Sequence, residues 1–189
     1  MIQPVSIAMD EKFVSDAAYY AFKTVTCSFE SGMKSRFGNG GLIKHILGKL
    51  GETAFFRFCL QNGVAVKHTP FRSDYSKLNG CDDFVISIMG LDFVVEVKTA
   101  TIKDPLNPDP KLRLFYNKDQ YDAKQDHNYI VVFAAVNHAI TKIALLGWIH
   151  AQDIAKFPVW KKNMQSPAYS IPVGELKDLR ELAGVVEDV

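Results

Sequence analysis

The sequence predicts an α/β domain built on one mixed β-sheet that is flanked by helices. Apolar residues recur at helical spacing in two long N-terminal segments, whereas short runs rich in Val, Ile and Phe occupy the middle of the chain. The predicted order is helix, helix, three strands, helix, two strands, helix, which is typical of helices packed on a mixed sheet. The chain has 189 residues, of which 48% are hydrophobic, so it can bury the core of one domain.

Two helices are predicted in the first third of the chain. The first covers residues 9–30 and carries apolar side chains at helical spacing, namely Phe13, Ala17, Tyr20 and Val25. The second covers residues 41–63 and ends at Asn62-Gly63; its apolar track is Leu42, Ile46, Leu50, Ala54 and Phe58. Gly48 and Gly51 each weaken this helix by about 1 kcal/mol. We therefore expect these small residues to let another segment approach closely.

Five strands and three shorter helical segments are predicted further along the chain. The strands are expected at residues 64–69, 83–88, 92–98, 128–136 and 141–149. Asn117 has the character of an N-cap, with Gln120 at the third position of a capping box, so a short helix should run to about residue 127. Residues 151–157 predict a helical turn, and residues 171–184 predict a capped amphipathic helix.

The second and third strands form a predicted hairpin that brings polar side chains together. A two-residue turn at Met89-Gly90 pairs Ile88 with Leu91 and keeps the apolar faces of both strands on one side of the sheet. Counting back along this register puts Asp83 opposite Glu96, with their Cβ atoms roughly 4.5–5.5 Å apart. Lys98 is the next residue on the same face, because side chains alternate along a strand.

Two facing carboxylates repel each other, and a divalent cation between them removes the repulsion. Mg²⁺ prefers oxygen ligands from one or two carboxylates and keeps several waters. The hairpin therefore predicts a metal site with a lysine beside it. The alternative for Glu96 and Lys98 is a simple ion pair at a sheet edge. The chain repeats this spacing at Glu175 and Lys177, where we expect a solvated pair on the predicted C-terminal helix.

These residues resemble the PD-(D/E)XK nuclease superfamily, which has the restriction-endonuclease-like fold. The matching residues are Glu52 in the second helix, residues 83–86, residues 95–98 and the polar helix start at residues 117–121. The resemblance covers about residues 41–136 and implies an αβββαβ core with a mixed central sheet flanked by helices. Asp82 stands where the family name has proline, which leaves the choice between Asp82 and Asp83 open.

The resemblance implies Mg²⁺-dependent hydrolysis of DNA phosphodiester bonds, with Mn²⁺ as a substitute. Asp83, Glu96 and the backbone carbonyl of Val97 would hold the metal, and Glu52 would complete the cluster directly or through water. Lys98 would orient or deprotonate the attacking water, or stabilise charge at phosphorus. Gln120 and Lys118 would orient the site or contact phosphate. The alternatives are a solvated helix residue for Glu52, a capping residue for Gln120 and plain surface for Lys118.

Contacts to DNA are expected from local basic patches, because the net charge of the whole chain is only +1. The candidates lead into the helix that bears Glu52 or lie in a loop beside the site: Lys34, Arg36, Lys44, Lys49 and Arg72. A solvated surface is the alternative for each of them taken singly.

The expected organisation is a nuclease core at residues 41–150 between two helical extensions, residues 1–40 and 151–189. A small nuclease that cuts duplex or branched DNA often works as a symmetric homodimer, which favours a junction-resolving or restriction-like endonuclease. We expect a cytoplasmic protein of a prokaryote or a phage-infected cell, because the chain shows no signal peptide, no membrane span and no disulfide framework.

Two other functions are compatible with the sequence. One is a non-catalytic DNA-binding or assembly protein that retains the nuclease fold. The other is a metal-dependent enzyme that acts on a substrate other than nucleic acid. Metal binding separates the first from a nuclease, and salt-dependent DNA binding separates the second.

Overall fold

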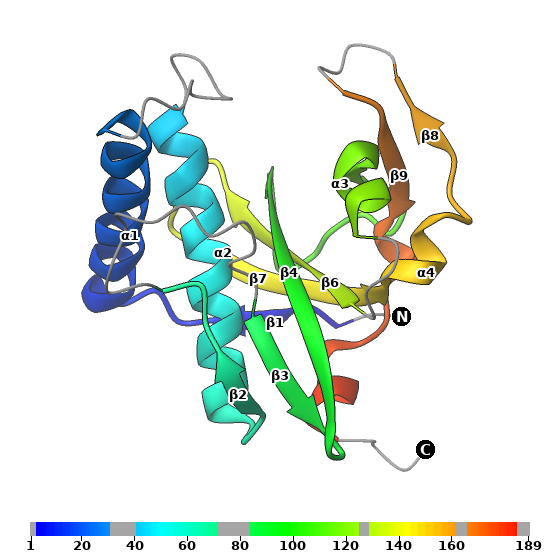
Figure 1. The fold of residues 1–189 in the computed structure, drawn as a ribbon, viewed down its shortest axis with the longest axis horizontal. Helices are drawn as coiled ribbons and strands as arrows, with labels where there is room; N and C mark the ends of the chain where they lie inside the picture. The colour runs from blue at the N-terminus through cyan, green and yellow to red at the C-terminus, as the bar shows by residue number, and fades with distance from the viewer. Residues whose placement is uncertain (1–2, 31–40, 72–83, 125–128, 162–165, 185–189) are drawn as a thin grey trace.

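A six-stranded sheet forms the centre of the computed structural model, which describes residues 3–30, 41–71, 84–124, 129–161 and 166–184 (Figure 1). The strand order is β1-β7-β6-β4-β3-β2. Neighbouring strands are antiparallel except β4 and β6, which are parallel, so the predicted mixed sheet is confirmed. The strands are β1 (Val5–Ile7), β2 (Ala65–His68), β3 (Phe84–Ile88), β4 (Leu91–Ile102), β6 (Tyr129–Asn137) and β7 (Ile143–His150).

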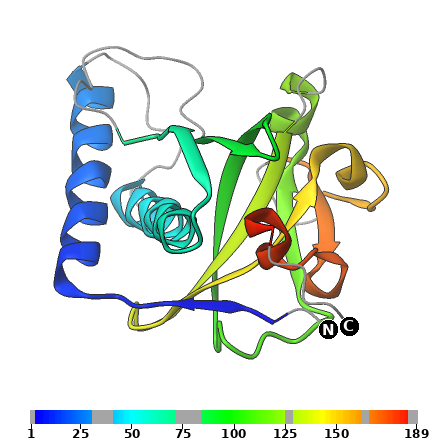
Figure 2. The same cartoon turned by 90° about the horizontal axis from the view of Figure 1, so that it is seen from below.

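Helices α1 (Glu11–Glu30) and α2 (Gly41–Gln61) pack together on one face of this sheet, as Figure 2 shows. Both agree with the predicted helices. Asp10 accepts a hydrogen bond from the Phe13 amide at 2.8 Å, and this bond satisfies a backbone donor at the start of α1. The same carboxylate binds Arg57 of α2 through two contacts of 2.8 and 2.9 Å, which ties the two helices together.

The opposite face of the central sheet carries a second, smaller layer. It contains helices α3 (Lys118–Ala123) and α4 (Ala151–Ile154) and a three-stranded antiparallel sheet of order β5-β9-β8. These strands are β5 (Arg113–Asn117), β8 (Val159–Trp160) and β9 (Ala168–Pro172). Strand β6 is buried on both faces, because alternate side chains enter the core under α1 and α2 or the core under the small sheet. Its unbroken apolar run follows from this position.

The predicted hairpin is confirmed in its register. Ile88 pairs with Leu91 across the turn, and Phe84 pairs with Val95 at the other end. Met89 and Gly90 both have positive φ, 51° and 80°, as a tight two-residue hairpin turn requires. Asp83, the next residue before this register begins, lies outside the described residues.

Several strands differ from the prediction. Strand β4 runs on to Ile102, beyond the predicted end at residue 98, because its parallel pairing with β6 continues to Ile102 and Asn137. Strands β1, β5, β8 and β9 were not predicted. Strand β1 pairs with β7 and so adds the N-terminal segment to one edge of the central sheet.

The predicted amphipathic α-helix over residues 171–184 is wrong. Strand β9 ends at Pro172, and two 3₁₀ helices follow, η2 (Val173–Glu175) and η3 (Leu179–Ala183). The buried side chains recur every third residue, at Val173, Leu176, Leu179 and Leu182. No single helix carries them, because Leu176 and Asp178 have extended backbone, with ψ of 153° and 132°, and Lys177 between them pairs with Trp148 in an antiparallel β-bridge. Lys177, predicted as half of a solvated pair, lies over the Trp148 ring at 4.7 Å.

The Cys59 thiol is expected to resist alkylation in the folded protein. Cys59 is fully buried on α2, and burial raises its pKa to about 12, so almost no reactive thiolate forms at pH 8. We expect mass spectrometry to find the Cys59 peptide unmodified after iodoacetamide treatment at pH 8, and fully modified when urea is present. Rapid modification without urea would show that α2 opens readily.

No helix in the described ranges is both long enough and apolar enough to cross a membrane.

Candidate functional site

Glu96 on β4 is the centre of the candidate site. Its relative exposure is 5%, and it is the one charged residue buried among those the structure describes. Its carboxylate contacts Lys98 Nζ at 2.5 Å through Oε1. The other oxygen, Oε2, accepts from the Tyr116 hydroxyl at 2.5 Å and from Lys124 Nζ at 3.1 Å. A buried carboxylate needs such partners, because an unpaired buried charge is strongly unfavourable.

The charge state of Glu96 follows from these contacts. Burial raises the pKa of its carboxyl, but the positive charges of Lys98 and Lys124 and the hydrogen bonds from Lys98 and Tyr116 outweigh burial. The net result is a pKa below the ordinary value for glutamate. Glu96 is therefore a carboxylate at neutral pH, which is the form that binds a cation.

Lys98 connects Glu96 to helix α3. Its ammonium donates to Gln120 Oε1 at 2.9 Å and lies 5.5 Å from the centre of the Tyr116 ring. Asn117 caps α3 as predicted, since its side chain accepts from the amides of Asp119 and Gln120. The side chain of Gln120 extends to Lys98, and the backbone of Gln120 takes part in the cap. This arrangement places Gln120 beside the two residues of the predicted motif.

A cavity of about 130 Å³ adjoins Glu96 where β3 begins. Its lining comes from α2, from the segment after β2, and from β3 and β4: Glu52, Pro70, Phe84, Val95, Glu96, Val97 and Lys98. The volume exceeds that of a single water several times, since one water occupies about 30 Å³ in the liquid. Glu52 Oε2 also contacts Lys49 Nζ at 2.6 Å, so the second carboxylate of the cavity is held by a lysine too.

Gly51 explains how α2 brings Glu52 to this cavity. A Cβ atom at position 51 would lie 2.0 Å from Thr99 Oγ1 and 3.2 Å from the Ala134 Cβ. The helix therefore touches β4 and β6 at a point where only glycine fits. Gly48, one turn earlier, has nothing within 4 Å of such an atom. The expected close approach is thus confirmed for Gly51 alone.

The described residues offer oxygen donors that a metal ion would need. Within them no group of three or more His, Cys, Asp or Glu side chains gathers, and Asp83 lies outside them. The oxygen donors at hand are the carboxylates of Glu52 and Glu96, with the backbone carbonyl of Val97 as a further candidate at the cavity. Such a donor set suits Mg²⁺ or Mn²⁺ better than a softer metal.

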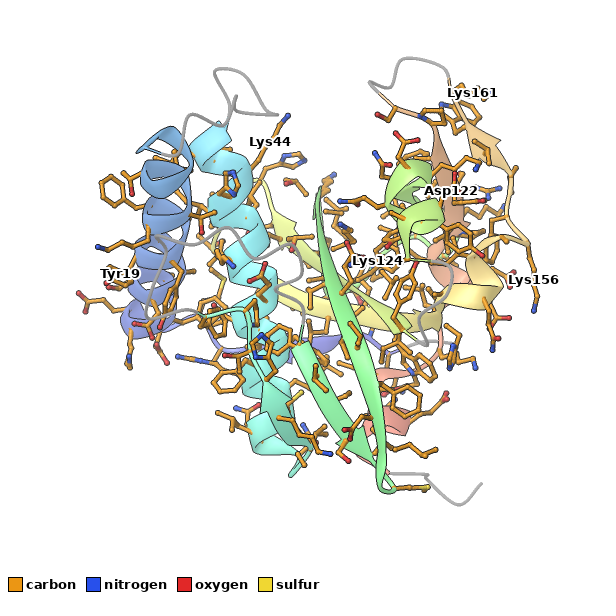
Figure 3. The ribbon with its side chains drawn as sticks, viewed as in Figure 1. Tyr19, Lys44, Asp122, Lys124, Lys156 and Lys161 are labelled. Carbon is orange, nitrogen blue, oxygen red and sulfur yellow. The ribbon has the colours of Figure 1, made fainter. Side chains whose placement is uncertain are left out.

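The predicted DNA-contacting residues are only partly described. Lys34, Arg36 and Arg72 lie outside the described residues. Lys44 is exposed near the N-terminal end of α2, as Figure 3 shows. Lys49 is mostly buried against Glu52 and the Phe71 ring, and Lys118 forms an ion pair with Asp122 at 2.5 Å.

Sequence reasoning missed Tyr116 and Lys124, which both bind Glu96. The alternation of β5 held one signal, since Leu114 and Tyr116 face inward while Arg113 and Phe115 face outward. Lys124 could have been found from its position four residues after Gln120. Residues at this spacing lie on the same side of a helix, and Lys124 is the C-cap of α3. Figure 3 shows Lys124 next to β4 at the end of α3.

Comparison with protein-family models, curated proteins and solved structures gives no match to this chain.

Proposed function

We propose that the protein is a metal-dependent DNA endonuclease of the PD-(D/E)XK type. The observation that carries the proposal is the grouping of Glu96, Lys98 and Gln120 beside a cavity that Glu52 also lines. These residues come from three separate elements, α2, β4 and α3. An isolated ion pair at a sheet edge would need neither the cavity nor the contact with Gln120.

In this proposal Glu96, Glu52 and Asp83 would hold Mg²⁺ together with the backbone carbonyl of Val97. When bound, the metal supplies Lewis-acid polarisation of the scissile phosphate and lowers the pKa of a coordinated water. Lys98 would orient the attacking water or stabilise the charge that develops on the phosphate oxygens. Gln120 keeps the Lys98 ammonium in place, since its amide oxygen accepts a hydrogen bond from it at 2.9 Å.

The charge around the cavity favours an anionic substrate. Three lysines, Lys49, Lys98 and Lys124, contact the two glutamates Glu52 and Glu96, so this cluster of five side chains has one excess positive charge, although only Lys98 of the three lysines lines the cavity. A bound divalent cation would add to this excess. Phosphodiester groups carry the complementary charge, and such attraction raises both binding and the rate of encounter.

A second candidate function is a DNA-binding protein without catalysis. The observation in its favour is that each glutamate at the cavity already forms an ion pair with a lysine. Such pairing satisfies the buried charge without any metal. This alternative predicts DNA binding that does not depend on a divalent cation.

Cleavage of a DNA panel tests the proposal. The panel contains supercoiled plasmid, linear duplex, single strand and a four-way junction, each incubated with Mg²⁺, with Mn²⁺ and with EDTA. We expect cleavage that EDTA abolishes and that Lys98→Met lowers by about 10²–10⁴-fold, the usual contribution of a positioned acid–base group.

Lys67→Met is the matched control, because Lys67 lies on β2 and forms an exposed ion pair with Asp92 of β4 at 2.6 Å. It should cut like the wild type. The preferred substrate would define the subtype, junction-resolving or restriction-like, and a two-strand cut would support the homodimer. Metal-independent binding without cleavage of any substrate would favour the DNA-binding alternative.

A further inference from the structure

The two oxygens of Glu96 have partners of different kinds. Oε1 contacts Lys98, whose side chain lines the cavity with Glu96 and Glu52. Oε2 receives hydrogen bonds from Tyr116 and Lys124, which come from β5 and from the end of α3. Oε2 is therefore held by residues of β5 and the end of α3, and Oε1 has its contact at the cavity.

Tyr116 is a rigid partner for Oε2. It is fully buried, and β5 pairs it with Tyr169 of β9 in the small sheet. Its hydroxyl lies 3.4 Å from that of Tyr129 on β6, so the phenol is held between the small sheet and the central sheet. A phenol is protonated at neutral pH and the Glu96 carboxylate can only accept, so Tyr116 is the donor in its contact with Oε2.

Lys124 acts on the same oxygen in a different way. Its ammonium is 3.1 Å from Oε2 and lies over the Tyr129 ring at 5.8 Å. Its positive charge offsets the negative charge of the buried carboxylate. The same charge repels a divalent cation that binds near Glu96. Tyr116 brings a hydrogen bond and no charge. Removal of the two groups should therefore have different effects on metal binding.

We propose that Tyr116 is a positioning residue whose hydroxyl holds Oε2 of Glu96, so that Oε1 is the oxygen presented to a divalent cation in the cavity. The inference rests on the proposed function, because it assigns a partner to the metal-binding carboxylate. Hydrogen bonds to ligating carboxylates orient the ligand, and the loss of such a partner usually weakens metal binding about 10–100-fold.

Mn²⁺ binding measured by titration calorimetry tests this role without DNA. Tyr116→Phe removes only the hydroxyl and should weaken Mn²⁺ binding by about 10–100-fold. Tyr169→Phe is the matched control, because Tyr169 is a buried tyrosine directly opposite Tyr116 whose ring packs on Tyr121 at 5.0 Å. It should bind Mn²⁺ within twofold of the wild type. Thermal melting followed by circular dichroism confirms that each variant is folded at the assay temperature.

Lys124→Met provides a second test should Tyr116→Phe not fold. If Tyr116 holds Oε2, this variant keeps the orientation of Glu96 and loses a nearby positive charge, so its Mn²⁺ affinity should stay equal or rise. A tenfold fall would overturn the inference, because Lys124 would then be the residue that holds Oε2.

The outcomes separate this inference from the proposed function. Wild-type binding together with unchanged affinity in Tyr116→Phe overturns the role of Tyr116 and leaves the metal site in place. A wild-type protein that binds no Mn²⁺ overturns the proposed metal-dependent activity, and the role of Tyr116 with it. Selective loss in Tyr116→Phe supports both.

Discussion

Under the proposed function, replacing Glu96 with glutamine is expected to lower the rate of DNA cleavage by about 10³-fold, since Lewis-acid catalysis by a bound metal would contribute several kcal/mol and each 1.4 kcal/mol is tenfold in rate. Glutamine keeps the shape of the side chain and still accepts the hydrogen bond from Tyr116. It lacks the negative charge that a divalent cation requires. Calorimetry with Mn²⁺ should therefore show weak binding or none, and a plasmid-cleavage time course should show the loss of rate.

Glu175→Gln is the control for this substitution. Glu175 precedes Leu176 and Lys177 with the same spacing as Glu96 and Lys98, but it is exposed in η2. It should leave Mn²⁺ binding and cleavage unchanged. Cleavage at the wild-type rate by Glu96→Gln would remove Glu96 from the reaction. Equal losses in both variants would point to a general effect of charge.

Adding one methyl group at Gly51 is expected to destabilise the fold, whereas the same change at Gly48 should stabilise it. In Gly51→Ala the new Cβ would lie 2.0 Å from Thr99 Oγ1. Overpacking of this kind costs about 1–3 kcal/mol. A chain of this length loses about 2–4 °C in Tm for each kcal/mol. In Gly48→Ala nothing lies within 4 Å, so the gain of about 1 kcal/mol in helix propensity should appear as a higher Tm.

A double substitution checks the cause. Thr99 Oγ1 is buried and has no hydrogen-bond partner among the described residues, so Thr99→Ala removes the clash without loss of a known bond. Thr99→Ala combined with Gly51→Ala should recover part of the lost Tm. Gly51→Ala should also slow DNA cleavage, because Glu52 is the next residue on the displaced helix. If the double variant recovers none of the lost Tm, the contact with Thr99 is not the cause of the destabilisation.

Local patterns were sufficient to predict the hairpin and the start of α3. Alternating side chains in residues 84–95 and a two-residue turn determine the register without help from distant parts of the chain. The Asn117 cap likewise depends on amides within three residues. These predictions succeeded because both the cause and the effect lie within a few residues of each other.

Features that depend on distant contacts were not predicted. Strand β5 is a five-residue segment after a proline-rich loop, and β9, its partner in the small sheet, lies about 50 residues further along. The C-terminal segment was predicted as a capped amphipathic helix, but backbone hydrogen bonds between Lys177 and the distant Trp148 interrupt it. Tyr116 reaches Glu96 from β5 and Lys124 from the end of α3, and both contacts depend on how these elements pack on β4, so both partners of Glu96 Oε2 were absent from the prediction.

Strand β1 has a consequence for how the protein is made. Ile7 pairs with Ile143, so the partner of the first strand is synthesised about 130 residues later. At about 5–20 residues per second, the N-terminal strand waits roughly 7–26 s on the ribosome before β7 exists. During that time the nascent chain cannot close this edge of the sheet or complete the core beneath α1 and α2. A ribosome that stalls before residue 143 would therefore present unpaired strands and apolar surface to chaperones, and a folded partial domain would not form.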